Sequence, residues 1–159
     1  ARSAGLNVPV RPAKGYSITM PLNGWNGGPR MPLIDDGFHA AITQIGDTIR
    51  VAGTAEFAGL DQSLNQERLD NLYKLLNEIY PSFAPHFDPK TVSEWAGLRP
   101  LSPDGSPFIG RTPIDNLYLN TGHGPLGWTM AAGSSKMLSD IIRRENPSLN
   151  PEFYRLGRT

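Results

Sequence analysis

Residues 95–110 read WAGLRPLSPDGSPFIG, and residues 122–129 read GHGPLGWT. In the first segment Arg99 precedes Pro100, and a residue before proline is biased toward extended backbone. The tetrad SPDG at residues 102–105 has the residue types that a type I turn favours at each of its four positions. We therefore expect Arg99 to have a fixed backbone position at the end of a strand.

The second segment has the composition of a loop that leads into a helix. Residues 116–121 are expected to form a strand, and a helix is expected from about residue 127 to residue 144. Backbone N–H groups at a helix N-terminus bind negative charge, and a lone guanidinium is suited to a carboxylate. We interpret the two segments as halves of one anion-binding site, one for a substrate and one for a cofactor.

Each half also has an ordinary interpretation. Most arginines form surface or interface ion pairs, and a fixed Arg99 is as consistent with that role as with a carboxylate clamp. On spacing alone, residues 122–129 are better explained as a plain strand-to-helix turn. His123 alone is more typical of a packed or hydrogen-bonded histidine than of a catalytic residue.

The remaining chain predicts an α+β fold with a mostly antiparallel sheet. Residues 16–20 alternate between apolar and polar side chains, and two β-rich runs at residues 38–45 and 48–54 flank the turn Gly46-Asp47. A helix is expected over residues 61–80, because leucine and tyrosine residues recur there at spacings of three and four. Ser63 and Gln66 have the spacing of a capping box near its start.

Composition excludes several classes of function. The 15 Lys+Arg residues balance the 15 Asp+Glu residues, and no basic run occurs, so we expect no nucleic-acid partner. The apolar runs are too short for a transmembrane segment, and no signal peptide is visible. The absence of cysteine excludes thiolate chemistry, and the three histidines are too widely spaced in sequence to predict a metal site.

Several stretches, in the same order along the chain, resemble the FAD-dependent D-amino-acid oxidase superfamily, and within it the D-amino-acid dehydrogenases most closely. They are PVRPAKGYS at residues 9–17, RVAGTAEF at residues 50–57, GLRP and SPDGSP within residues 97–107, and NTGHGPLGWTMA at residues 120–131. The resemblance implies a substrate-binding domain over residues 1–95. It also implies the last strand and helix of a Rossmann-like FAD-binding domain over residues 96–145, with a tail at residues 146–159.

The resemblance also implies roles for particular residues. Arg99 matches the arginine that pairs with the amino-acid carboxylate in the glycine-oxidase branch of the superfamily. Tyr16 would lie on a strand of the sheet that covers the flavin, and Ile18, Arg50 and Glu56 are weaker candidates for the same surface. The edge of the flavin ring would be lined by Gly122, His123, Gly124, Pro125, Leu126, Gly127, Trp128 and Thr129.

The implied reaction is oxidative deamination of a D-amino acid. The Cα–H leaves as a hydride to the flavin of FAD, and the resulting imino acid hydrolyses to a 2-oxo acid and ammonia. This chemistry depends on orientation and on a deprotonated amine, so we assign no catalytic acid or base. The expected location is the cytoplasm, with association at the surface of the inner membrane as a further expectation.

One departure from the family is the absence of the Gly-x-Gly-x-x-Gly sequence that binds the FAD pyrophosphate. The chain also begins without Met, so we expect a C-terminal fragment whose partner is a missing N-terminal FAD-binding segment. Alone it should bind FAD weakly and self-associate through exposed apolar surface. A glycine- or sarcosine-type amine oxidase and a non-catalytic binding or assembly module stay open as alternatives.

Overall fold

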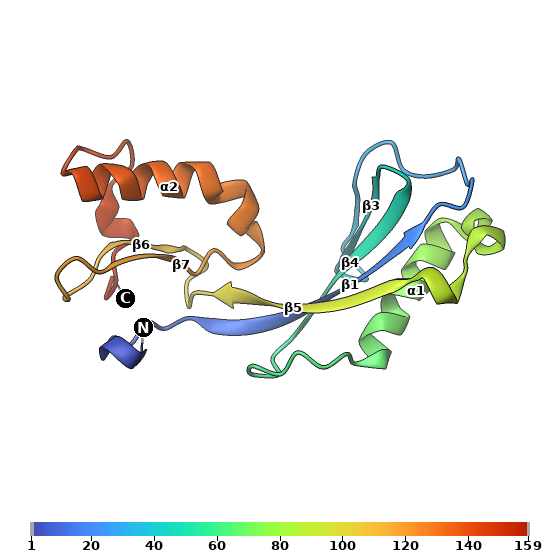
Figure 1. Ribbon diagram of the computed structural model, residues 1–159, viewed down its shortest axis with the longest axis horizontal. Coiled ribbons are helices and arrows are strands. Elements are labelled where there is room, and N and C mark those ends of the chain that lie inside the picture. The colour runs from blue at the N-terminus through green and yellow to red at the C-terminus, as the bar shows by residue number, and fades with distance from the viewer. Residues whose placement is uncertain (1, 159) are drawn as a thin grey trace. The chain divides into compact units, whose positions relative to one another are not determined.

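The computed structural model describes residues 2–158, which form two compact units (Figure 1). One unit comprises residues 13–98, and the other comprises the described residues up to 12 and from 99 onward. The chain thus passes between the units twice, within the strands that begin near residue 11 and end near residue 101. The assignment of residues 1–95, 96–145 and 146–159 to a substrate domain, a cofactor domain and a tail stays a prediction.

A five-stranded sheet in the order β2-β3-β4-β1-β5 organises the first unit. Its strands are β1 (Arg11–Pro21), β2 (Leu33–Asp35), β3 (Ala40–Ile45), β4 (Thr48–Glu56) and β5 (Ser93–Leu101). The pairs β2–β3, β3–β4 and β4–β1 are antiparallel. The predicted α+β fold with a mostly antiparallel sheet is therefore confirmed.

The predicted hairpin is present in β3 and β4. Ile45 pairs with Thr48, so Gly46 and Asp47 form the connection between the strands. Gly46 has a φ of +59°, a conformation that glycine adopts without a steric penalty. A two-residue connection of this kind sets the register of the whole hairpin.

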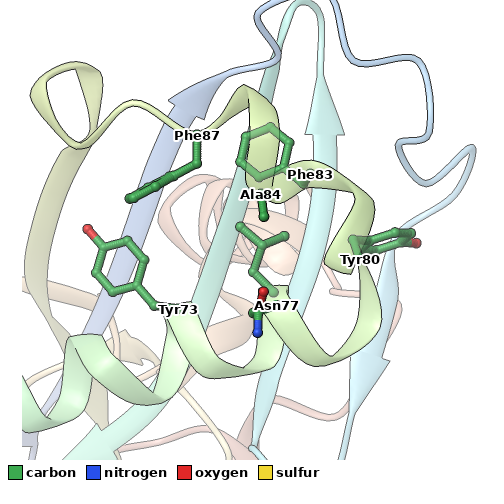
Figure 2. A pocket seen from close by; sticks show the side chains of 7 residues that line it. Tyr73, Asn77, Tyr80, Phe83, Ala84 and Phe87 are labelled. Atoms are coloured by element: carbon green, nitrogen blue, oxygen red, sulfur yellow. The ribbon is translucent and has the colours of Figure 1, made fainter.

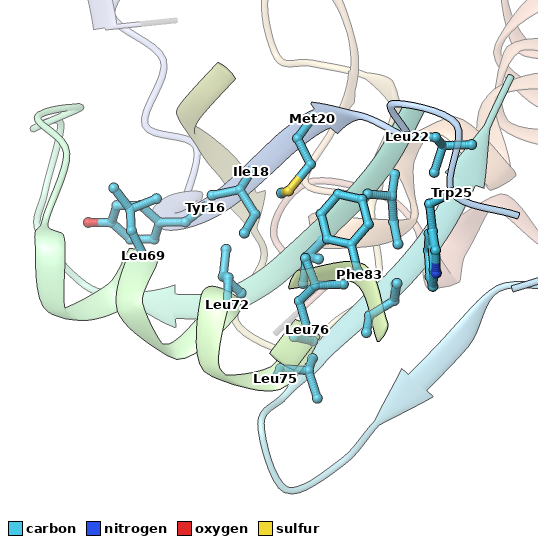
Figure 3. Packing of buried hydrophobic residues seen from close by; sticks show 14 of the residues in the cluster. Tyr16, Ile18, Met20, Leu22, Trp25, Leu69, Leu72, Leu75, Leu76 and Phe83 are labelled. Atoms are coloured by element: carbon cyan, nitrogen blue, oxygen red, sulfur yellow. The ribbon is translucent and has the colours of Figure 1, made fainter. Parts of the chain in front are cut away.

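One face of the sheet packs against the helix α1 (Gln66–Ile79) (Figure 3). Because side chains alternate along a strand, Tyr16, Ile18 and Met20 all point to this face, and each is at most 1% exposed. The helix contributes a stripe of four buried leucines, Leu69, Leu72, Leu75 and Leu76. Burial of these apolar side chains is the main stabilising contribution to this unit.

The start of α1 differs from the sequence prediction. Its N-cap is Asn65, whose side chain accepts a hydrogen bond from the backbone N–H of Glu67, so Ser63 and Gln66 form no capping box. The Ser63 hydroxyl instead donates to Asp61 at 2.7 Å, and Asp61 also accepts from Lys14 at 2.9 Å. These contacts hold residues 61–63 in a loop, and the helix begins after them.

Two short 3-10 helices, η2 (Pro81–His86) and η3 (Pro89–Thr91), connect α1 to β5. A cavity of about 210 Å³ lies between α1 and η2 (Figure 2). Tyr73 and Phe87 lie at one end of it with ring centroids 5.9 Å apart, and Tyr80 lies at the other end. None of the predicted site residues lines this cavity.

The second unit contains a two-stranded antiparallel ladder and a long helix. Its elements are η1 (Arg2–Ala4), β6 (Phe108–Arg111), β7 (Tyr118–Thr121), η4 (Gly124–Leu126), α2 (Gly127–Arg143) and η5 (Pro151–Phe153). The predicted helix over residues 127–144 is confirmed. Its buried positions are Ser134, Met137 and Asp140, whereas Ile142 near its C-terminal end is 47% exposed.

Residues near the C-terminus are anchored to the turn that follows β5. The guanidinium of Arg158 donates to both carboxylate oxygens of Asp104, at 2.9 and 2.8 Å, and to the carbonyls of Ser106 and Pro107. It also lies 4.0 Å from the ring centroid of Phe108. Arg158 lowers the pKa of the Asp104 carboxyl, because its positive charge and hydrogen bonds stabilise the ionised form.

We expect Leu72→Ala to lower the free energy of unfolding by about 2–5 kcal/mol, because it leaves a cavity beneath α1. Urea denaturation measures this change. The matched control is Leu60→Ala, whose side chain is 80% exposed and whose effect should stay within about 0.5 kcal/mol. Equal effects of the two substitutions would contradict the packing of α1 on the sheet.

Candidate functional site

Arg99 lies near the C-terminal end of β5, where the sequence predicts an extended residue. Its side chain is partly buried, and this burial lowers the pKa of the guanidinium. Arginine nevertheless stays protonated at neutral pH, because the ordinary pKa of its guanidinium is far above 7. The charged, planar guanidinium of Arg99 therefore lies near the end of a strand. Hydrogen bonds from Arg158 fix the turn that follows this strand.

The glycine-rich loop meets this strand through its backbone. Leu101, two residues beyond Arg99, forms an isolated antiparallel bridge with His123. Gly122, next to the bridge, has a φ of +85°, which a residue with a side chain adopts only with strain. The structure therefore brings the loop that begins at Gly122 alongside the end of β5, within the same unit.

The start of α2 has no side chain that caps its backbone N–H groups. Leu126 is the N-cap residue and makes no side-chain cap hydrogen bond, and the first turn contains no acidic residue. Trp128, in that first turn, is 95% exposed. The N–H groups and the positive end of the helix dipole are therefore suited to a negatively charged or electron-rich group.

Two buried polar atoms lie beside the bridge. In residues 2–158, the hydroxyl oxygen of Ser102 and the Nε2 atom of His123 are buried and have no hydrogen-bond partner. Burial lowers the pKa of the His123 imidazole, which is therefore mostly neutral at pH 7. Buried polar atoms are normally hydrogen-bonded, so these two fit a site that receives a polar ligand.

Tyr16, which the resemblance places on the sheet that covers the flavin, lies on the α1 side of that sheet. Its ring is 1% exposed in the core beneath α1, and its hydroxyl donates a hydrogen bond to the carboxylate of Glu56. Burial and the neighbouring Glu56 carboxylate raise the pKa of the Tyr16 hydroxyl. The role of Tyr16 in substrate binding stays a prediction.

The weaker candidates Ile18, Arg50 and Glu56 do not share one surface with each other. Ile18 faces α1 and is fully buried, whereas Arg50 alternates with the α1-facing residues of β4 and lies on the opposite face. Glu56 lies near Lys14, with 3.5 Å between carboxylate oxygen and ammonium. The period-two alternation of strands separates these residues, and the sequence alone did not reveal which face each one takes.

Comparison with known proteins identifies the family. A model of the family described as FAD dependent oxidoreductase matches residues 1–141. The chain belongs to this family. D-amino acid dehydrogenases of Methylobacterium sp. (strain 4-46) and Xanthobacter autotrophicus (strain ATCC BAA-1158 / Py2) are 45% and 44% identical to it, over 96% and 97% of its length. The chain spans 36% of the length of each relative.

Solved structures show the same fold for this part of the FAD-dependent oxidoreductase family. Glycine oxidase from Geobacillus kaustophilus matches 98% of the chain with a TM-score of 0.82 and 20% identity. Iminodiacetate oxidase from Chelativorans sp. BNC1 matches 95% with a TM-score of 0.83 and 24% identity. The chain covers 41% of each of these two proteins.

Two polar residues that the sequence does not single out, Lys14 and Ser102, have buried side chains in the structure. Lys14 is 1% exposed and donates to Asp61 and to the carbonyl of Ser63. The sequence predicts a turn at Ser102, and the fold places this residue beside Gly122. No local pattern distinguishes a buried lysine from a surface one, because its carboxylate partner is 47 residues away.

No helix within residues 2–158 combines the length and the apolar character that crossing a membrane requires. Association with the surface of the inner membrane stays a prediction.

We expect Gly122→Ala to destabilise the chain by at least about 1 kcal/mol, because alanine is strained at a φ of +85°. The nearest atoms would be 3.4 Å from the new Cβ, so the strain lies in the backbone rather than in a steric clash. Gly133→Ala is the control, because Gly133 lies in α2 with open space around it. That substitution should stabilise the helix by about 0.5–1 kcal/mol, and urea denaturation compares the two.

We expect the stability of the chain to depend on the protonation of His123. Its pKa is lowered in the folded state, so the unfolded state binds more protons between that pKa and about 6.5, and stability falls as pH decreases through this range. His123→Gln should remove this contribution. Urea midpoints at pH 7.5 and 5.5 would show a smaller difference for the variant, and an equal difference would contradict the expectation.

Proposed function

We propose that this chain forms the substrate-binding part, and one wall of the cofactor site, of an enzyme that oxidatively deaminates D-amino acids to 2-oxo acids and ammonia. The observation that supports this most directly is the Leu101–His123 bridge, which joins the glycine-rich loop to the strand of Arg99. The similarity to D-amino acid dehydrogenases over almost the whole chain favours the same reaction.

Arg99 is the proposed partner of the substrate carboxylate. A guanidinium can form two parallel hydrogen bonds to a carboxylate, which fixes both the position and the orientation of the amino acid. Partial burial of Arg99 strengthens this attraction, because water competes less for the charge. The turn anchored by Arg158 limits movement of the strand end that carries Arg99.

The proposed cofactor contacts lie in residues 122–129. When bound, FAD supplies the acceptor of the hydride that leaves the substrate. The uncapped N–H groups at the start of α2 would stabilise negative charge on the flavin ring, and the glycines of the loop permit a close approach of the backbone. Neutral His123 adds a polar ring at this edge without adding a second positive charge.

Tyr16 is the second proposed substrate residue, and its contacts favour an indirect role. Its hydroxyl is engaged with Glu56, and Glu56 is also near Lys14. Tyr16 would therefore act by holding the end of β4 in place rather than by touching the amino acid. Orientation of the substrate, rather than a strong acid or base, is what this chain contributes to the reaction.

A chimera tests the proposal. The matching segment of the Methylobacterium D-amino acid dehydrogenase is replaced by this chain, and the purified protein is examined for flavin absorbance and for oxidation of D-alanine with an artificial electron acceptor. We expect a yellow, active enzyme. A colourless chimera would contradict the cofactor role, and activity on glycine or sarcosine without activity on D-alanine would overturn the proposed substrate class.

In the same chimera, Arg99→Lys should raise KM for D-alanine by about tenfold or more, because one ammonium cannot replace the two hydrogen bonds of the guanidinium. Arg143→Lys is the matched control, since Arg143 is exposed and pairs with Glu145 at 2.6 Å. Its kinetics should equal those of the parent chimera. An unchanged KM for Arg99→Lys would remove Arg99 from the site.

A further inference from the structure

The cavity of about 210 Å³ between α1 and η2 is lined chiefly by aromatic side chains (Figure 2). The two helices and the residues that end them contribute four rings, those of Tyr73, Tyr80, Phe83 and Phe87. All four belong to the unit of residues 13–98, whereas the glycine-rich loop belongs to the other unit. A role for this cavity therefore does not depend on the proposed oxidation of D-amino acids.

Contacts with neighbouring residues hold the rings of this cavity in place. At one end, the Tyr73 hydroxyl donates to the carboxylate of Glu94 in β5 at 2.7 Å. At the other end, the buried Trp25 ring packs edge-to-face against Tyr80 and Phe83, with 5.5 and 5.0 Å between ring centroids. The cavity is thus preformed, and a ligand can bind there without first ordering these side chains.

The size of the cavity limits its occupant to a small molecule. An apolar cavity of about 150 Å³ holds one benzene molecule, whereas pockets for drug-sized ligands measure about 300 Å³ or more. At about 210 Å³, this cavity is suited to one six-membered ring with a small substituent. Water is a poor occupant, because a buried water molecule needs about two to four polar partners and the lining is mainly apolar.

The chemistry of the lining indicates a neutral ligand with one polar group. Among the described residues that line the cavity, none has a charged side chain, so an ionised ligand would lose its hydration without gaining a partner. The exposed side chain of Asn77 also lines the cavity, and within residues 2–158 it makes no hydrogen bond. Because an amide both donates and accepts, Asn77 can bind one hydroxyl or N–H group.

We propose that the cavity between α1 and η2 binds a small, neutral, aromatic molecule of the phenol type. The ligand ring makes edge-to-face contacts with the surrounding aromatic side chains, and these contacts favour it over a saturated ring of the same size. Its hydroxyl group forms a hydrogen bond with the amide of Asn77. The site thus recognises both the ring and its single polar substituent.

The test is an NMR titration of the complete 159-residue chain with phenol. The signal followed is the Nε1–H of Trp25, which donates to the Ser82 hydroxyl at 3.3 Å beside the cavity. The Nε1–H of Trp128, whose side chain is 95% exposed, is the internal control. We expect a saturable shift of the Trp25 signal and none of the Trp128 signal, with binding of cyclohexanol severalfold weaker. Absence of a saturable Trp25 shift, or equal affinity for cyclohexanol, would overturn the proposal.

A variant that fills the cavity locates the binding site. Ala84 lines the cavity and is exposed, so Ala84→Leu adds apolar volume there without entering the core. This substitution should weaken phenol binding at least about tenfold, because the larger side chain occupies the space of the ring. Ala55→Leu is the matched control, since Ala55 is exposed in β4 of the same unit and does not line the cavity. Unchanged phenol binding in Ala84→Leu would overturn the proposal.

A second variant covers the case in which Ala84→Leu fails to fold. Phe87→Leu removes one aromatic ring from the lining but keeps an apolar side chain, and Phe87 is 38% exposed, so the core is not disturbed. Phenol binding should weaken about threefold or more, and cyclohexanol binding by a smaller factor, because only the aromatic contact is lost. Unchanged phenol binding, or an equal loss for both molecules, would contradict aromatic recognition in this cavity.

Discussion

The backbone pairing of Leu101 with His123 is the constraint on which the geometry of the candidate site depends. These residues come from different elements, one from the end of β5 and one from the loop before α2. The pairing requires the chain to turn sharply at Gly122, and the positive φ at that residue provides the turn. Without it, the position of the helix N-terminus relative to Arg99 would be set by a flexible loop.

The local elements were largely predictable from the sequence, because their signals are local. The Gly46-Asp47 turn, the alternation at Tyr16 and Ile18, and the limits of α2 are each encoded within a few residues, and the structure agrees with them. The bridge between Leu101 and His123 was not predictable in this way, because 22 residues separate its partners. The expected convergence of the two segments came from their chemistry and from the resemblance to a family.

The differences from the sequence prediction arise where side chains compete for the same partner. Ser63 has the spacing of a capping residue, but its hydroxyl donates to Asp61, and Asn65 caps the helix instead. The ring of Tyr16 lies in the core, as the alternation predicts, but its hydroxyl donates to Glu56, a contact that the sequence did not predict. In both cases a tertiary contact that spans many residues, Lys14 with Asp61 or Tyr16 with Glu56, determines the outcome.

The anchoring of Arg158 has a consequence for how the protein is handled and engineered. A single side chain near the C-terminus holds the carboxylate of Asp104 and two carbonyls of the turn that follows Arg99. Proteolytic trimming after Arg155 would therefore release a turn about fifty residues upstream, and an affinity tag fused directly behind Arg158 would crowd the same turn. An internal surface loop such as residues 26–32 is a safer place for a fusion, because it lies in the other unit.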